Sequence, residues 1–189
     1  MTRVRRVQWP SIAAGLLVGG ALGWGAQEAR SIDWQNLTAP VDERPLVIRQ
    51  DAKGDGHFGA PRSGNRMHRG IDLTAPLGTP VRAVRSGIVV TTGTHRGLGQ
   101  YVELEHRGGW HSLYAHLQDI DAQVGHRVRQ GERIGTVGKT GNARNRLITP
   151  HVHFEMVKDG QPVDPSTMGL EIAQTPIVNP TEQNADGGE

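Results

Sequence analysis

Two neighbouring segments alternate apolar and polar residues with a period of two, the pattern of strands that bury one face. They are residues 101–106 and 111–116, and Gly108-Gly109 lies between them. Paired glycines between two alternating segments are typical of a hairpin turn. The pattern therefore predicts an antiparallel hairpin over residues 101–116.

Five further segments have the composition of short strands, being rich in β-branched residues and bounded by glycine. They are residues 81–84, 87–90, 124–128, 133–137 and 152–157. Short strands at regular spacing with glycine turns favour an all-β sandwich or barrel. No segment between residues 55 and 168 has a convincing helical period. We expect an all-β fold, a small antiparallel β-sheet or sandwich domain over residues 55–168.

The first 27 residues differ in composition from the rest. Arg3, Arg5 and Arg6 precede an uncharged stretch from Val7 to Gln27, which indicates a signal anchor or a signal peptide. A membrane span needs about 20 apolar residues, so this stretch is just sufficient if Trp9 and Trp24 lie at the two interfaces. We expect an uncleaved anchor, and either alternative exports the rest of the chain.

The segments flanking the expected domain are polar. Residues 28–54 contain Pro40 and Pro45 and are interpreted as a linker. Residues 169–189 contain two further prolines and end in a polar run, which predicts a disordered tail.

Composition excludes several classes of function. The chain has no cysteine, so a thiol nucleophile and a lipid-attached cysteine are both excluded. Residues 57–168 hold 14 Lys and Arg against 9 Asp and Glu, an excess that suits an anionic polymer as partner. Two Phe and two Tyr are few for base stacking, so we expect no nucleic-acid partner.

Candidate metal chemistry lies at two places in the chain. His68 and Asp72 are four residues apart, and His151 and His153 are two apart. A straight strand would separate His68 from Asp72 by about 13 Å, so we expect a bend at Gly70, where glycine permits unusual backbone angles. A catalytic zinc takes three protein ligands and keeps a position for water, and this set would leave one histidine for proton transfer.

His116 ends an alternating segment, in which Tyr114 shares its expected face. Tyr114 is open to two interpretations, packing in the wall or contact with a substrate. Asn65 and Arg66 precede the first histidine and are candidates for substrate contact. Arg144 and Arg146 precede the last pair and are open to two interpretations, a solvated loop or a contact for the anionic wall. Five histidines have no partner pattern and are expected at the surface or in loops: His57, His95, His106, His111 and His126.

Three blocks in order resemble the lysostaphin-type, or LytM-domain, zinc endopeptidases. The blocks are His68 with Asp72, Tyr114-Ala115-His116-Leu117, and His151 with His153. The flanks agree as well, and they are Phe58-Gly59-Ala60-Pro61-Arg62, Gly78-Thr79-Pro80-Val81, the glycine-rich stretch 128–141 and Val163-Asp164-Pro165.

The resemblance implies one zinc ion held by His68, Asp72 and His153, and catalytic histidines at His116 and His151. It implies a groove over the metal and the stem peptides of bacterial peptidoglycan as substrate. By analogy with the family, the chain is expected to be an inner-membrane-anchored periplasmic protein that cuts the D-Ala to diamino-acid cross-link.

Two functions of different class remain open. The first is a zinc endopeptidase, in which His151 is the general base and His116 its partner or a hydrogen-bond donor to the oxyanion. The second is a non-catalytic activator of another wall hydrolase, and intact ligand positions favour the enzyme. Two regulatory hypotheses also remain: a partner protein, and inhibition by residues 28–50 lying over the groove.

Overall fold

The structure is a computed structural model that describes residues 37–173. The expected membrane segment over residues 1–27 and the expected tail beyond residue 173 lie outside the described residues. Between residues 37 and 173, no helix has the length and apolar character needed to cross a membrane.

The described residues form strands and two short 3-10 helices. The elements are β1 Gln50–Asp51, β2 Gly54–Asp55, β3 Pro61–Arg62, β4 Arg66–Met67, β5 Ile71–Thr74, β6 Pro80–Arg82, β7 Gly87–His95, β8 Gly99–His106, β9 Trp110–Ile120, β10 Arg127–Val128, β11 Arg133–Val137, η1 Gly141–Arg144, β12 His151–Lys158, β13 Gln161–Val163 and η2 Pro165–Thr167.

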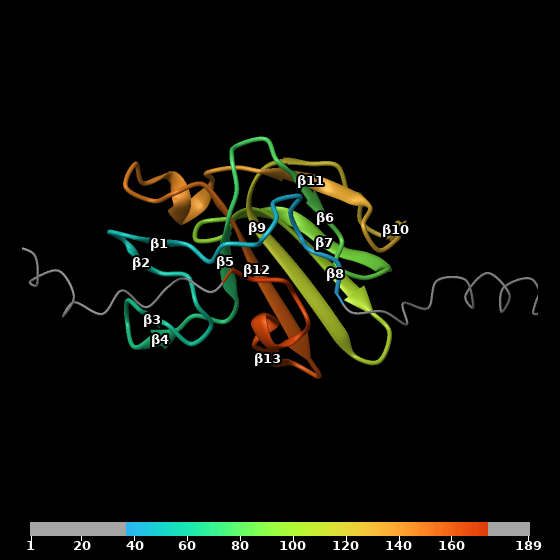
Figure 1. The fold of residues 1–189 in the computed structure, drawn as a ribbon. Helices are drawn as coiled ribbons and strands as arrows, with labels where there is room; N and C mark the ends of the chain where they lie inside the picture. The colour runs from blue at the N-terminus through green and yellow to red at the C-terminus, as the bar shows by residue number, and fades with distance from the viewer. Residues whose placement is uncertain (1–36, 174–189) are drawn as a thin grey trace, which may run out of the picture. The chain divides into compact units, whose positions relative to one another are not determined.

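Nine strands form one sheet in the order β10-β7-β8-β9-β11-β6, to which β12 adds β5 and β13. Figure 1 shows β8, β9 and β12 among the long strands of the domain. Every pairing between the named strands is antiparallel. The predicted hairpin is β8–β9, and Gly108 and Gly109 of its turn both have a φ of 73°. The prediction of a small antiparallel β domain is confirmed.

The core lies against one face of this sheet. Val152, Phe154 and Met156 alternate along β12 and are fully buried. Tyr114 on β9 lies beside Phe154, with 5.4 Å between the ring centroids. The Tyr114 hydroxyl accepts a hydrogen bond of 2.9 Å from the Val84 N–H, so Tyr114 packs in the core and makes no groove contact.

Residues 37–50 also belong to this core, so the interpretation of residues 28–54 as a linker is wrong for the described part. Leu37, Val41, Leu46 and Ile48 are all at most 7% exposed. Pro40 and Pro45 do not prevent this, because the segment pairs through isolated bridges, such as Ile48 to Leu73, rather than a continuous ladder. The described part of the suggested inhibitory segment therefore packs into the domain.

The other end of the domain extends past the predicted boundary at residue 168. Leu170 is 9% exposed and packs in the core. Ile172 pairs with Leu46 in a parallel bridge. The prediction of a disordered tail from residue 169 is therefore wrong for residues 169–173.

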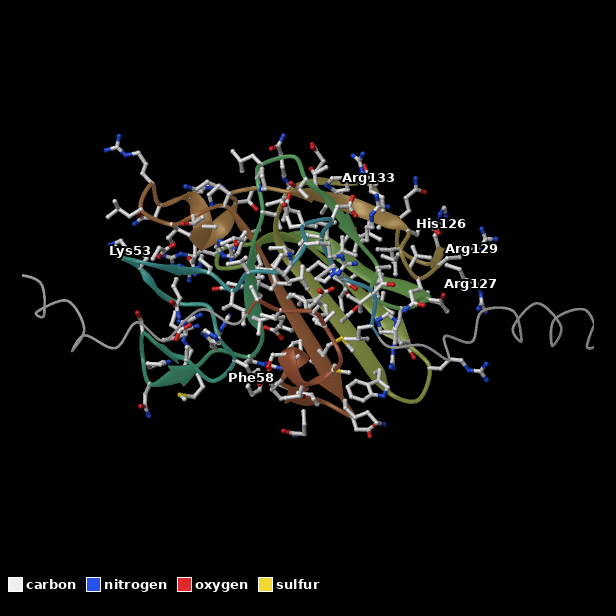
Figure 2. All side chains as sticks on the ribbon, viewed as in Figure 1. Lys53, Phe58, His126, Arg127, Arg129 and Arg133 are labelled. Carbon is white, nitrogen blue, oxygen red and sulfur yellow. The ribbon has the colours of Figure 1, made fainter. Side chains whose placement is uncertain are left out.

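Part of the basic excess gathers at one end of the domain. His126, Arg127, Arg129 and Arg133 lie around β10 and the loop that leads to β11 (Figure 2). All four are exposed, and Arg133 forms an ion pair of 2.7 Å with Asp121. In the sheet, β7 and β8 lie between β10 and β9, so Arg127 on β10 is distant in strand order from β12, whereas Arg133 begins β11, which pairs with β9.

The chain bends at Gly70 as predicted, but for a different physical reason. Gly70 does not adopt a positive φ. Instead, a Cβ at this position would lie 2.2 Å from the Phe154 carbonyl oxygen on β12. Glycine is needed because the backbone before β5 passes directly against β12.

We expect Gly70→Ala to destabilise the protein by about 1–3 kcal/mol, the usual cost of overpacking, because β5 must move away from β12. Gly97→Ala is the matched control, since a Cβ there meets nothing nearer than 3.5 Å. Chemical denaturation followed by fluorescence measures both free energies of unfolding. Equal stability of the two variants would contradict the packing role of Gly70.

Candidate metal centre

Strands β5 and β12 bring the two halves of the candidate site together. In their antiparallel register His153 lies opposite Asp72, and His151 lies opposite Thr74. Residues two apart on a strand share a face, so His151 and His153 both lie on the face opposite Val152 and Phe154. The bend at Gly70 then returns His68 to the start of β5.

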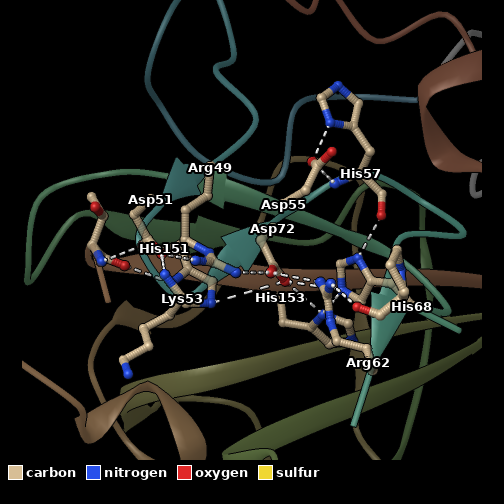
Figure 3. A network of polar contacts seen from close by, with 12 residues as sticks. Arg49, Asp51, Lys53, Asp55, His57, Arg62, His68, Asp72, His151 and His153 are labelled. Carbon is tan, nitrogen blue, oxygen red and sulfur yellow. Dashed lines mark hydrogen bonds and ion pairs between the residues drawn. The ribbon is translucent and has the colours of Figure 1, made fainter. Parts of the chain in front are cut away.

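Three potential ligand atoms lie at the corners of a small triangle. His68 Nε2 is 3.1 Å from Asp72 Oδ1 and 2.9 Å from His153 Nδ1, and His153 Nδ1 is 2.9 Å from Asp72 Oδ1. Figure 3 shows the three side chains directed at one another. All three are buried and could hold a metal ion together.

This donor set fits zinc. Zinc is bound at about 2.0–2.2 Å by imidazole nitrogen and carboxylate oxygen, which places neighbouring ligands of a tetrahedral site about 3.3 Å apart. The sides of the observed triangle are close to that spacing. Two nitrogens and one carboxylate oxygen match the ligand chemistry of catalytic zinc sites.

Each candidate ligand is held by a second contact that orients it. His68 Nδ1 donates to the His57 carbonyl at 2.8 Å, which leaves Nε2 unprotonated in the neutral ring. His153 Nε2 lies 3.0 Å from Glu155 Oε1, so its Nδ1 is the atom left for the centre. Partners of this kind fix the tautomer and orientation of metal-binding histidines.

The electrostatics of the centre favour a carboxylate and a cation side by side. Burial opposes the charge on Asp72, but the hydrogen bond from His153 and the contact with His68 hold its pKa well below the usual range. Burial also opposes the protonated form of His153, yet the hydrogen bonds with Asp72 and Glu155 raise its pKa to about 9. A metal at Nδ1 must displace this proton, so metal affinity should fall as the pH falls.

His116 reaches the centre through a β-bulge in β9. Leu117 pairs with Gln100 of β8 and Tyr114 pairs with Val102, so two residues of β9 stand opposite the single residue between them. His116 has a φ of 63°, in the left-handed region that a non-glycine residue seldom adopts. The bulge breaks the alternation, so Tyr114 points into the core and His116 toward the histidines of β12. The prediction that Tyr114 and His116 share a face is wrong.

His116 and His151 form a pair beside the triangle. Their ring centroids are 4.9 Å apart in an edge-to-face arrangement. The Nδ1 of His116 lies 3.0 Å from the Thr140 carbonyl and that of His151 lies 2.7 Å from the Thr149 carbonyl. A carbonyl oxygen only accepts, so both rings carry their proton on Nδ1 and leave Nε2 free.

Both of these rings are neutral at neutral pH. Burial, together with the nearby histidines, lowers the pKa of His116 to about 3. Burial likewise lowers the pKa of His151. His151 Nε2 lies 3.9 Å from Asp72 Oδ1, so an unprotonated nitrogen is directed at the triangle. The centre thus combines three potential metal ligands with two proton acceptors.

Two charged residues at the centre were missed by the sequence interpretation. Arg49 lies in the segment that was interpreted as a linker, and it donates a hydrogen bond of 3.0 Å to Asp72 Oδ2. Glu155 orients His153. The alternation of His151, His153 and Glu155 along one strand was a usable signal for Glu155. No local pattern indicated Arg49. Arg62, the last residue of the Phe58–Arg62 flank, contacts the same oxygen at 3.4 Å.

One histidine outside the centre was misplaced. His106 was expected at the surface but is 5% exposed, with Nε2 2.7 Å from Ser112 Oγ. Val102, Leu104 and His106 are two residues apart in turn and therefore share a strand face. The two apolar residues were the sequence signal that His106 is buried. Asn65 lies in the turn between β3 and β4 with a φ of 57°, and both Asn65 and Arg66 are exposed.

A hollow adjoins the strand end that carries His151. Its volume is about 330 Å³, and its lining is mainly apolar: Glu43, Pro45, Val47, Thr74, Ala75, Pro76, Thr149 and Pro150. The hollow is not lined by any of the triangle residues, and the expected groove over the metal stays a prediction.

The chain resembles proteins of known family in sequence. Residues 66–165 match the profile of Peptidase family M23. The chain is 45% identical over 105 residues to the DD-carboxypeptidase/endopeptidase Mpg of Neisseria meningitidis, covering 56% of this chain and 23% of that protein. It is 38% identical over 110 residues to the peptidoglycan DD-endopeptidase ShyC of Vibrio cholerae, covering 58% and 24%. The chain thus spans about a quarter of the length of the curated relatives it matches.

A solved structure agrees with this result. A mutant of the catalytic domain of the prophage-encoded M23 protein EnpA from Enterococcus faecalis superposes with a TM-score of 0.54. The two are 32% identical, and the match covers 69% of this chain and 97% of that one. Since the family profile extends over more than half of the chain, the protein belongs to peptidase family M23.

Proposed function

We propose that the protein is a zinc-dependent endopeptidase that hydrolyses peptide cross-links of bacterial peptidoglycan. The observation that carries the proposal is the triangle of His68 Nε2, Asp72 Oδ1 and His153 Nδ1 with two neutral histidines beside it. The name of ShyC, a peptidoglycan DD-endopeptidase, supports this substrate class, and that of Mpg, a DD-carboxypeptidase/endopeptidase, supports this type of reaction.

In this proposal His68, Asp72 and His153 hold the metal. A bound zinc ion supplies Lewis-acid activation of water and of the scissile carbonyl. The protein contributes the fixed carboxylate and two imidazoles, each oriented by its own second contact. Burial of the three side chains limits screening by solvent, so charge interactions among them are strong.

His151 is assigned as the general base. Its free Nε2 accepts a proton from the attacking water and returns one to the departing amine, while Nδ1 stays bound to the Thr149 carbonyl. Positioned acid–base groups of this kind contribute about 10²–10⁴-fold to a rate.

His116 is assigned as the partner of His151. Since its Nδ1 proton is held by the Thr140 carbonyl, the neutral ring can only accept at Nε2. A hydrogen bond from His116 to an oxyanion would therefore require the protonated ring, which burial disfavours. With the ring centroids 4.9 Å apart, a charge on one ring disfavours a charge on the other, so the pair carries at most one additional proton at a time.

A non-catalytic activator of another wall hydrolase is the alternative that the sequence left open. An activator needs neither a complete ligand triangle nor two imidazole rings beside it with a free Nε2. Both features are present in the described residues, and they favour the enzyme.

The location in the cell envelope is part of the proposal and rests on the sequence of residues 1–27. A basic start before an uncharged stretch would anchor the chain in the inner membrane and place the domain in the periplasm. Peptidoglycan would then be the adjacent polymer, and its anionic character suits the basic excess of the domain.

Digestion of isolated peptidoglycan by the zinc-loaded full chain tests the proposal. Mass spectrometry of the released fragments should show cross-linked dimers converted to monomers by cleavage between D-Ala and the diamino acid. Intact dimers after treatment with protein that carries one equivalent of zinc would contradict the endopeptidase and favour the activator.

A further inference from the structure

Arg49 reaches the metal centre from a segment that the family match does not include. The match begins at residue 66, whereas Arg49 directly follows Ile48, which is buried in the core. The Arg49 N–H donates to the Asp72 carbonyl at 2.8 Å, and the Gly56 N–H donates to the Arg49 carbonyl at 2.8 Å. These contacts fix the backbone of Arg49 beside β5. The Arg49 side chain therefore begins next to Asp72.

The guanidinium of Arg49 lies between two carboxylates. Nη2 donates to Asp72 Oδ2 at 3.0 Å, and Nη1 contacts Asp51 Oδ1 at 2.6 Å as an ion pair without the alignment of a hydrogen bond. The side chains of Arg49 and Asp72 are each 6% exposed. Solvent therefore screens little of this interaction, unlike that of a surface pair.

The contact with Asp72 decides which carboxylate oxygen faces the triangle. Arg49 holds Oδ2, so Oδ1 is the oxygen that lies 2.9–3.1 Å from the ring nitrogens of His153 and His68. Arg62 approaches the same Oδ2 at 3.4 Å with a side chain that is 26% exposed. It is the looser contact and is not equivalent to the buried guanidinium.

The contact with Asp51 continues to the proposed general base. Asp51 Oδ2 accepts a hydrogen bond of 2.9 Å from the Thr149 N–H, and the Thr149 carbonyl accepts one of 2.7 Å from His151 Nδ1. Figure 3 shows this network, in which Arg49 links Asp72 on one side to Asp51 and His151 on the other. Arg49 thus contacts the candidate ligand Asp72 directly and is linked to His151 through Asp51 and Thr149.

We propose that Arg49 is a positioning residue of this enzyme: it directs Asp72 Oδ1 toward the metal and, through Asp51 and Thr149, fixes the ring of His151. The inference rests on the proposed zinc peptidase function. It extends the site to residues 49–51, which precede the part of the chain that matches the family.

Arg49→Gln in the full chain is the first test. Loss of an outer partner of a metal ligand typically costs about 10–100-fold in metal affinity, and we expect a loss in that range here. A chromogenic chelator that competes for zinc measures the affinity without any need for activity. At saturating zinc, kcat on peptidoglycan should also fall while KM stays nearly unchanged, because His151 is less well fixed.

Arg49→Lys is the second variant and guards against loss of folding. Lysine keeps the charge but, as a point charge, cannot hold both carboxylates with a planar fork. We expect a zinc affinity between those of the wild type and Arg49→Gln, with far-ultraviolet circular dichroism unchanged.

Arg82→Gln is the matched control. Arg82 on β6 forms an exposed ion pair with Asp42, with Nη2 2.9 Å from Asp42 Oδ2, and so ties the same N-terminal segment to the sheet away from the metal centre. If Arg49 merely anchored that segment, the Arg82 variant would lose zinc to the same extent.

The inference is overturned if Arg49→Gln keeps zinc affinity and kcat within twofold of the wild type. It is equally overturned if Arg82→Gln loses as much affinity as Arg49→Gln. A wild type that binds zinc but cleaves no peptidoglycan would reject the proposed function instead, and the affinity comparison would still decide whether Arg49 positions Asp72.

Discussion

His153→Ala is expected to abolish stable zinc binding and to lower kcat on peptidoglycan by at least about a thousandfold, since a catalytic metal contributes several kcal/mol. The substitution removes one corner of the triangle and leaves only His68 Nε2 and Asp72 Oδ1, which are 3.1 Å apart. It also removes the partner that Glu155 holds at 3.0 Å. Two protein ligands are fewer than catalytic zinc sites use.

Zinc content after dialysis and fragment release from peptidoglycan measure the two effects separately. His126→Ala is the matched control, because that histidine is exposed at the β10 end of the domain (Figure 2). It should keep both zinc and activity. A His153→Ala protein that retains a full equivalent of zinc at the same affinity would contradict the assignment of this ligand.

His151→Gln is expected to lower kcat by about 10²–10⁴-fold, the usual contribution of a general base, while zinc binding is largely retained. The ring lies beside the triangle, with Nε2 3.9 Å from Asp72 Oδ1, and is not one of its corners. Glutamine keeps a polar side chain but cannot take up a proton at neutral pH. The loss should therefore appear in the chemical step and not in metal content.

The pH dependence of the activity of the wild type is expected to have a definite direction. A general base works when neutral, so activity should fall as the pH falls through its pKa. Because burial lowers the pKa of His151, the acid limb should lie below the ordinary histidine value of about 6.5. Zinc content measured at each pH separates this limb from loss of metal.

The same limb should disappear or move in His151→Gln, and His126→Gln should keep the wild-type profile. A variant at residue 151 with a full rate and an unchanged acid limb would exclude His151 as the base. In that case His116, whose pKa burial lowers to about 3, would be the remaining candidate, with a limb at much lower pH.

Much of the sheet could be predicted from the sequence because its strands carry a local signal. β8 from Val102 to His106 and β9 from His111 to Tyr114 alternate buried and less buried residues with a period of two, and the β8–β9 turn carries paired glycines. The distance argument on His68 and Asp72 also required a bend at Gly70, and the chain does bend there. Each of these inferences used neighbours within a few residues.

The position of His116 could not be predicted in this way. A strict alternation places it with Tyr114, and one additional residue in the bulge reverses that assignment for the rest of the strand. Bulges have no reliable pattern in a single sequence. Ordinary residue types fill this one, and the left-handed residue is histidine rather than glycine.

Arg49 and the segment around it were missed for a different reason. The alternation of Leu37, Ala39 and Val41 was present in the sequence, but Pro40 and Pro45 led to the interpretation as a linker. The contact with Asp72 joins residues 23 positions apart, and such a pairing is fixed only by tertiary folding.

The bulge at His116 also means that deletion of a single residue would remove a proposed catalytic histidine while the strand pairing is kept. β9 changes its partner there, from β12 for residues 110–115 to β11 for residues 117–120. Deletion of one residue at this point would restore an unbroken alternation, a pattern that a sheet accepts readily. Deletion of His116 itself would keep Tyr114 and Leu117 on the core face with Ala115 between them, and the metal triangle would remain. Descendants of such a deletion would keep the shape and the metal but lack one of the two histidines, a short evolutionary path from a hydrolase to a binding protein.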